Sequence, residues 1–207
     1  MSTIPKDPRR GVHALSLGDV TLAPLTASDV DAIWAACASD RSTYGYTPVP
    51  TSREATENHI ASLLRDESVG DTINFVVRHQ ERVVGMTRYL TLREYFADHA
   101  LSAVEIGGTW LAPGAQRTHV NTTAKLLLLE NAFEHWNVRR VDLKSDARNE
   151  RSRRAIERLG AQFEGILRAW QPSLAPGEEG GVRDTAMYSV LAAEWPAVKV
   201  GLATALR

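Results

Sequence analysis

Apolar and polar residues recur with two different periods along this chain, and the change of period separates predicted strands from predicted helices. Alternation, or a short run of β-branched and aromatic residues, is typical of strands, whereas apolar residues three and four positions apart are typical of helices. Strands are predicted over residues 19–25, 72–79, 82–92, 105–111, 140–144, 162–170 and 182–191, and helices over 26–40, 51–67, 120–136, 149–159 and 195–206. Residues 1–18, which contain Pro5 and Pro8, are expected to form an extended lead-in.

The order of these elements predicts a mixed α/β sheet in one domain. A run of antiparallel strands, which includes a hairpin that turns at Gln80-Glu81, precedes two strand–helix units. A chain of 207 residues fits a single domain over 1–207 and is long enough to bury a core.

Net charge and residue content argue against several classes of protein. The formal net charge is −1, so no global attraction to nucleic acid or to a membrane surface is expected. Cys37 is the single cysteine, which excludes an intrachain disulfide and favours a reducing compartment. No apolar run suits a signal peptide or a membrane span, so a cytoplasmic protein is expected. The six histidines and Cys37 do not fall at ligand spacing, so no metal is predicted.

The most informative stretch is 104–160, where a predicted strand ends at Pro113-Gly114 and a turn opens a long helix. The first amides of a helix lack partners inside the helix, and the helix dipole makes this end positive. A phosphate satisfies both. The turn could therefore hold a pyrophosphate, although an ordinary strand-to-helix turn has the same sequence signals. The residues in question are Gln116, Arg117, Thr118, His119, Val120 and Asn121.

This turn resembles the phosphate loop of the GCN5-related N-acetyltransferases (GNAT), and most closely the branch that acetylates protein N-termini in bacterial ribosomes. The loop of that family has the pattern Gln/Arg-x-x-Gly-x-Gly/Ala. Gln116 matches the first position, whereas His119 and Asn121 replace the two small residues. Arg117 could compensate by pairing with the pyrophosphate.

A second motif of the family, Asn-x-x-Ser/Ala-x-x-x-Tyr-x-x-x-Gly, has its counterpart on the next strand–helix unit. Asn149, Ser152 and Gly160 match it, and Ile156 stands in place of the tyrosine. The resemblance covers about residues 19–195. It implies a mostly antiparallel sheet whose fourth and fifth strands splay apart, with helices on both faces.

The resemblance also implies that acetyl-CoA is the co-substrate and lies between the splayed strands. Backbone amides near Trp110 and Leu111 then hold the pantetheine arm and polarise the thioester carbonyl, and Asn149 binds the arm. The residues implied for acetyl-CoA are Trp110, Leu111, Gln116, Arg117, Thr118, His119, Val120, Asn121, Asn149 and Ser152.

Acetyl transfer to an amine requires a base for the amine proton and a partner for the leaving thiolate. Glu105, on the strand that faces the implied cleft, is the first candidate for the base, with the alternatives Asp98, His99 and His119. Ser152 is the candidate for the thiolate, as the family's tyrosine is absent. Tyr188 is a more distant choice for that role.

The acceptor is expected to lie against the loop 41–50, which is unusually aromatic. Arg41, Tyr44 and Tyr46 could line a groove, or the tyrosines could cover the edge of the core. Glu178 and Glu179 could attract a cationic acceptor, or could belong to a solvated turn.

Three hypotheses follow. The first is an acetyl-CoA-dependent N-acetyltransferase that acts on a protein N-terminus or a small amine. The second is a regulatory module that kept this fold and lost turnover, as His119, Asn121 and Ile156 suggest. The third is an RNA-associated protein that uses the basic run 139–158, which is disfavoured because no aromatic residues interleave with it. A homodimer is expected by analogy with the family.

Overall fold

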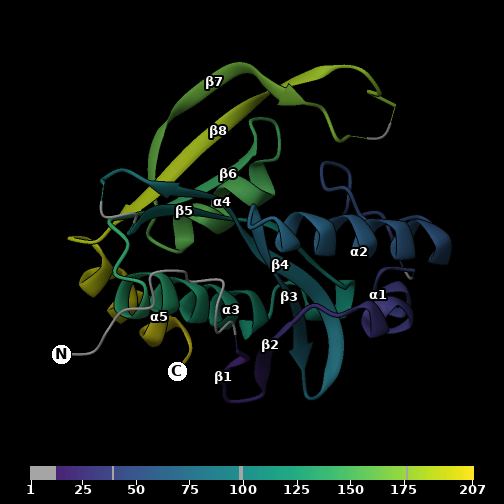
Figure 1. The fold of residues 1–207 in the computed structure, drawn as a ribbon, viewed down its shortest axis with the longest axis horizontal. Coiled ribbons are helices and arrows are strands. Elements are labelled where there is room, and N and C mark those ends of the chain that lie inside the picture. The colour runs from purple at the N-terminus through teal and green to yellow at the C-terminus, as the bar shows by residue number, and fades with distance from the viewer. Residues whose placement is uncertain (1–12, 39, 98–99, 176) are drawn as a thin grey trace.

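The computed structural model describes residues 13–38, 40–97, 100–175 and 177–207. They form a sheet of eight strands in the order β1-β2-β3-β4-β5-β6-β8-β7 (Figure 1). The strands are β1 (Leu15–Leu17), β2 (Val20–Pro24), β3 (Thr72–His79), β4 (Arg82–Glu94), β5 (Leu101–Leu111), β6 (Arg140–Asp146), β7 (Gln162–Pro172) and β8 (Val182–Leu191). Neighbouring strands are antiparallel except β5 and β6, which run parallel. The predicted mixed, mostly antiparallel α/β sheet is thus confirmed.

The helices agree with the pattern of apolar residues. They are α1 (Val30–Cys37), α2 (Arg53–Ser68), α3 (His119–Glu130), α4 (Glu150–Arg158) and α5 (Trp195–Ala205), with single 3₁₀ turns at Ala27–Asp29 and Pro113–Ala115. Ser52 caps α2 and Asn149 caps α4, each through a side-chain oxygen. Within the described ranges, no helix combines the length and apolarity needed to cross a membrane.

Two apolar cores lie on opposite faces of the sheet. One contains Tyr89 and Leu128 and packs α3, α4 and α5 against the strands. The other contains Ile33, Ile60 and Met86 and packs α1 and α2 against the opposite face. Figure 1 shows α1 and α2 on one side of β3 and β4, with α3 and α5 on the other. Helices therefore cover both faces, as expected.

A bulge in β5 exchanges the faces that its side chains occupy. The register against β4 shifts between Met86 and Arg88, and Gly108 lies opposite with a φ of +57°. Before the bulge, Ile106 belongs to the core under α3; after it, Trp110 belongs to the core under α1 and α2. A Cβ at Gly108 would lie 2.5 Å from Nε of Arg88, so glycine serves both the left-handed conformation and the close contact.

The strands β5 and β6 separate soon after they meet. Their parallel register contains Ala103 with Arg140, Val104 with Val141, and Glu105 with Asp142. Beyond Glu105, none of the described strands pairs with the edge of β5 that faces β6, while β6 continues its pairing with β8. The predicted splay between the fourth and fifth strands falls here, because β1 adds one strand to the expected count.

Several predicted boundaries were wrong; β5, for example, begins at Leu101 instead of residue 105. Residues 1–12 of the predicted lead-in 1–18 lie outside the described residues, and the rest of it contains strand β1, which pairs with β2 as a short hairpin. The helix predicted over 120–136 is α-helical only to Glu130 and then widens into a π-helical turn over Asn131–His135. The Tyr89 hydroxyl donates to the carbonyl of Leu128 (2.6 Å) just before this widening. The spacing of apolar residues along the sequence does not reveal a change from α-helical to π-helical hydrogen bonding.

Candidate active site

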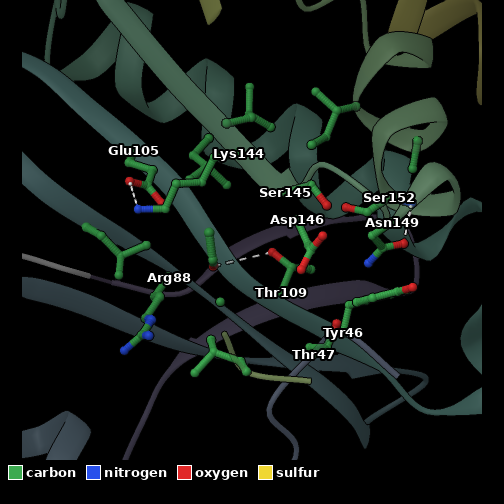
Figure 2. Close-up of a pocket in the computed structure, with 18 of the residues that line it drawn as sticks. Tyr46, Thr47, Arg88, Glu105, Thr109, Lys144, Ser145, Asp146, Asn149 and Ser152 are labelled. Carbon is green, nitrogen blue, oxygen red and sulfur yellow. Dashed lines mark hydrogen bonds and ion pairs between the residues drawn. The ribbon is translucent and has the colours of Figure 1, made fainter. Parts of the chain in front are cut away.

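A cavity of about 310 Å³ fills the gap between β5 and β6. Its walls come from β4, both splayed strands, α3, α4 and the loop after α1, so segments from most of the chain meet here (Figure 2). The polar residues that line it are Tyr46, Thr47, Arg88, Glu105, Thr109, Asn121, Lys125, Lys144, Ser145, Asp146, Asn149, Ser152, Gln171 and Arg183. Of these, sequence reasoning identified Tyr46, Glu105, Asn121, Asn149 and Ser152.

Glu105 lies where the two strands begin to separate. Only 5 % of the residue is exposed. Its Oε2 accepts from Nζ of Lys144 on β6 at 3.0 Å and from the hydroxyl of Thr91 at 3.4 Å. Figure 2 shows the carboxylate and the ammonium facing each other across the gap. A buried carboxylate with one cationic partner and an adjoining cavity can accept a proton from a bound ligand.

Lys125 is the unexpected member of the site. It extends from α3, is 5 % exposed, and donates to Thr109 Oγ1 (2.6 Å) and Thr87 Oγ1 (3.4 Å). Among the described residues it has no carboxylate partner. Burial therefore lowers the pKa of its ammonium to about 7.

Lys125 and Glu105 belong to opposite faces of β5. Lys125 comes from the helix that covers the face shared by Val104 and Ile106, and strand alternation points Glu105 to the other face. The bulge brings Thr109 back within reach of Lys125. The cavity is thus lined by the carboxylate of Glu105 on one side and by the ammonium of Lys125 on the other.

Asn149 and Ser152 form the α4 side of the cavity. Oδ1 of Asn149 accepts from the backbone N–H of Ser152 at 3.1 Å, which caps the helix and holds both side chains at the cavity wall (Figure 2). Ile156 lines the same wall. Tyr188 lies elsewhere: it is fully buried, and its hydroxyl bonds to Arg153 and Glu157. Tyr188 is therefore not a partner for a leaving group here.

The turn before α3 is stabilised by its own side chains. Thr118 accepts from the N–H of Val120 (3.3 Å) and donates to the carbonyl of Ala115 (2.7 Å). Arg117 adopts a left-handed φ of +60°. The ring of His119 does not lie over the turn, because its Nε2 contacts Oδ1 of Asp19 at 2.8 Å. The side chain that replaces the expected glycine is thereby directed toward β2.

Gln116 connects three segments. Its amide nitrogen donates to the hydroxyl of Thr43 (2.9 Å) and to the carbonyl of Leu111 (2.8 Å). Its amide oxygen accepts from Arg151, which also donates to the carbonyl of Thr43. Gln116 therefore fastens the turn to the loop 41–50 and to the end of β5.

Near Trp110, both a side chain and a backbone group of β5 are already engaged by other parts of the protein. The indole belongs to the core under α1 and α2 and packs edge-on against Tyr44, with ring centroids 6.2 Å apart. The carbonyl of Leu111 already accepts from Tyr44 and Gln116.

The three residues expected to line one acceptor groove border two different cavities. Arg41 donates to the carbonyls of Val49 (2.6 Å) and Pro50 (2.8 Å), and Tyr44 is 5 % exposed, so both hold the loop in place. They border a neighbouring surface hollow of about 480 Å³ instead of the cavity between the strands. Tyr46 does border the cavity, and the Arg148 guanidinium lies 5.2 Å from its ring centroid.

The charged groups noted in the sequence are largely paired. Glu178 binds Arg148 (2.7 Å) and Ser173 (2.5 Å), and these hydrogen bonds lower the pKa of Glu178 to about 2. In the basic run, Arg140 pairs with Asp142 and Glu164. Asp98 and His99, two alternatives for the base, lie outside the described residues.

Known proteins share this fold and its sequence pattern. Residues 19–162 match the sequence profile of the acetyltransferase (GNAT) domain.

A protein from T. thermophilus assigned as an acetyltransferase is 32 % identical, with a TM-score of 0.79 over 95 % of this chain and 98 % of that one. A GCN5-related N-acetyltransferase from Brucella melitensis is 27 % identical, with a TM-score of 0.83 over 97 % and 88 %. The ribosomal L7/L12 α-N-protein acetyltransferase RimL shares the fold at 18 % identity, with a TM-score of 0.73 over 87 % and 94 %. A search of curated proteins gave no match.

Proposed function

This chain belongs to the GNAT acetyltransferases, and on that premise we propose that it moves the acetyl group of acetyl-CoA to a primary amine in the cavity between β5 and β6. The acceptor is a protein N-terminus or a small amine. One observation supports this most: the cavity joins an open strand edge to Glu105 on one side and to Lys125 and Ser152 on the other.

The residues present fit acetyl-CoA. On the side that faces β6, residues 106–110 of β5 lack a strand partner among the described residues, so the amides and carbonyls that point to this side can pair with the amide groups of a pantetheine arm. The start of α3 offers a positive helix end for phosphates, and the ring of His119 leaves that turn clear by contacting Asp19. Acetyl-CoA supplies a thioester whose acyl carbon can be attacked by an amine.

Glu105 acts as the base. An amine that enters from the Tyr46 side meets the face of β5 to which strand alternation directs this carboxylate. Glu105 accepts one proton of the incoming ammonium, directly or through one water. The C–N bond then forms as the C–S bond breaks, and the nitrogen gives its second proton to solvent as the amide forms. Lys144 holds the carboxylate in place before the proton is transferred.

Lys125 provides the proton for the leaving sulfur. The family's tyrosine is replaced by Ile156, and the ammonium of Lys125 reaches the same cavity. With its pKa near 7, this ammonium is a stronger acid than a typical thiol, whose pKa is about 8.5. Transfer of a proton from Lys125 to the thiolate is therefore favourable. Ser152 adds a neutral hydrogen bond to the same sulfur.

The experiment combines binding with turnover. Isothermal titration of the full chain with acetyl-CoA should show one micromolar site, and release of free thiol should then depend on an added amine. Peptides with free N-termini and small diamines form the first panel, and N-acetylated peptides serve as matched controls. Acetyl-CoA binding without thiol release across the panel would favour the regulatory alternative instead.

A further inference from the structure

Three potential metal ligands gather at the edge of the first core, outside the cavity. Oδ2 of Asp19 lies 3.0 Å from Nε2 of His79, and Oδ1 of the same carboxylate lies 2.8 Å from Nε2 of His119. One ligand atom from each of the three residues falls within 4.8 Å of the others. The two imidazole rings meet edge to face, with centroids 5.3 Å apart and planes at 77°. Both rings thus direct Nε2 toward the same carboxylate, each toward a different oxygen.

The three residues come from separate, well-anchored elements. Asp19 lies in the turn between β1 and β2, His79 ends β3, and His119 opens α3. Strand pairing places Val20 opposite His79, and the backbone N–H of Gln80 donates to the carbonyl of Asp19 at 2.9 Å. The positions of the first two ligands are therefore set by the sheet and need little ordering when an ion binds.

We propose that Asp19, His79 and His119 bind a divalent transition metal ion, with zinc as the best fit. Imidazole nitrogen and carboxylate oxygen are ordinary zinc ligands at about 2.0–2.2 Å, and tetrahedral sites of that size separate their ligand atoms by about 3.3 Å. One ligand atom from each of the three residues already lies within 4.8 Å of the others, so side-chain rotations can bring them to this separation. Three protein ligands leave the fourth position for water, and the exposed carboxylate gives an ion access from solvent.

Such an ion joins the start of α3 to the β2–β3 pair. The turn that precedes α3 is the proposed phosphate site, so this consequence rests on the proposed function. A metal that fixes His119 orders the first amides of the helix before acetyl-CoA arrives. Metal and acetyl-CoA then strengthen each other's binding by the same factor, as linkage requires.

The test uses the full chain after removal of any affinity tag and dialysis against a chelator. Titration with zinc chloride should show one site per chain with micromolar affinity or better. Addition of cobalt(II) should give the visible absorption of a tetrahedral complex. The variants His79→Gln and Asp19→Asn should each weaken zinc at least 10-fold. His135→Gln, which changes an exposed histidine at the end of the π-helical turn, should leave affinity unchanged.

Zinc affinity that is equal in all four proteins, or absent from the unaltered chain, would overturn the proposal and leave a hydrogen-bonded cluster only. The result does not depend on turnover, because it is read from metal binding and from the zinc-dependent rise in melting temperature. Acetyl-CoA titrations with and without zinc form a separate arm. Failure of acetyl-CoA to bind in either case would count against the proposed function while the zinc result stands.

Discussion

The ammonium of Lys144 on β6 lies 3.0 Å from the carboxylate of Glu105 on β5, so an ion pair bridges the two strands where they separate. A buried carboxylate without a partner is costly, and the ammonium of Lys144 offsets that cost at a residue that is only 5 % exposed. Both side chains of the pair line the cavity. The ion pair that joins the two strands therefore also contains the proposed base.

Glu105→Gln should lower kcat by about 10²- to 10⁴-fold, because it removes the proposed proton acceptor and preserves the shape of the side chain. The KM for acetyl-CoA should change little. Initial rates measured by thiol release check this, with Glu150→Gln on the exposed start of α4 as the matched control. A rate within about threefold of the unaltered protein would remove Glu105 from the mechanism.

Lys144→Met should destabilise the fold by about 1–3 kcal/mol, since it leaves the Glu105 carboxylate buried with a single hydroxyl partner. Glu105→Gln removes the charge itself and should cost less. Chemical denaturation of both variants at pH 7 measures the difference. The opposite order of stability would show that the ion pair does not offset the burial of Glu105.

Lys125→Met should reduce kcat and also change its dependence on pH. The pKa of this ammonium is lowered to about 7, so its protonated fraction falls as the pH rises through 7. The rate of the unaltered enzyme should therefore show a decline above that pH, and the decline should be absent from the variant. Lys125→Arg keeps the charge but cannot give up a proton. Full activity of the arginine variant would mean that charge alone, and not proton transfer, is needed.

The same Lys125→Met variant should be more stable than the natural chain at pH 7, by on the order of a few kcal/mol. The folded-state pKa of Lys125 is lowered from 10.5 to about 7, so the unfolded chain binds the extra proton between those values. Stability of the natural chain therefore rises with pH across this window, and the advantage of the variant should shrink. Melting temperatures from pH 6 to 10 test the sign. An advantage that does not depend on pH would point to packing instead.

Ser152→Ala should lower kcat by about threefold to tenfold and leave stability unchanged. The capping contact of α4 uses the backbone N–H of Ser152, which alanine retains. Only the hydroxyl at the cavity wall is lost. Comparison with Asn149→Ala, which removes the cap and should cost about 1 kcal/mol, separates the two effects. A melting temperature that falls equally in both variants would argue against this division of roles.

The order of elements could be predicted from sequence because hairpin turns and apolar periods are local signals. Gln80 and Glu81 both adopt positive φ values at the predicted turn. The extra strand β1 was missed because three residues with little burial give no period. The π-helical turn after Glu130 was missed because the spacing of apolar residues is the same in the α-helical and π-helical readings of this stretch, and the Tyr89 hydroxyl that bonds to Leu128 beside it comes from a distant strand.

Only part of the site could be predicted, because the burial of a side chain and the groups that it contacts depend on the tertiary structure. Tyr44 and Tyr46 are two residues apart in the same loop, yet one enters the core and the other borders the cavity. Lys125 did leave a signal, as a lysine within a helix that is apolar on two sides. Asp19 lies 60 residues from His79 and 100 from His119, a separation at which no motif could have joined them.

The attachment of the loop 41–50 to the rest of the molecule has a consequence for redesign. Thr43 and Tyr44 are bonded to Gln116, Arg151 and the end of β5, so replacing either displaces the strand edge and the turn before α3 together. Positions 46–48 border the cavity without those bonds. A library intended to give this enzyme new amine substrates should vary these three positions and keep Thr43 and Tyr44 fixed.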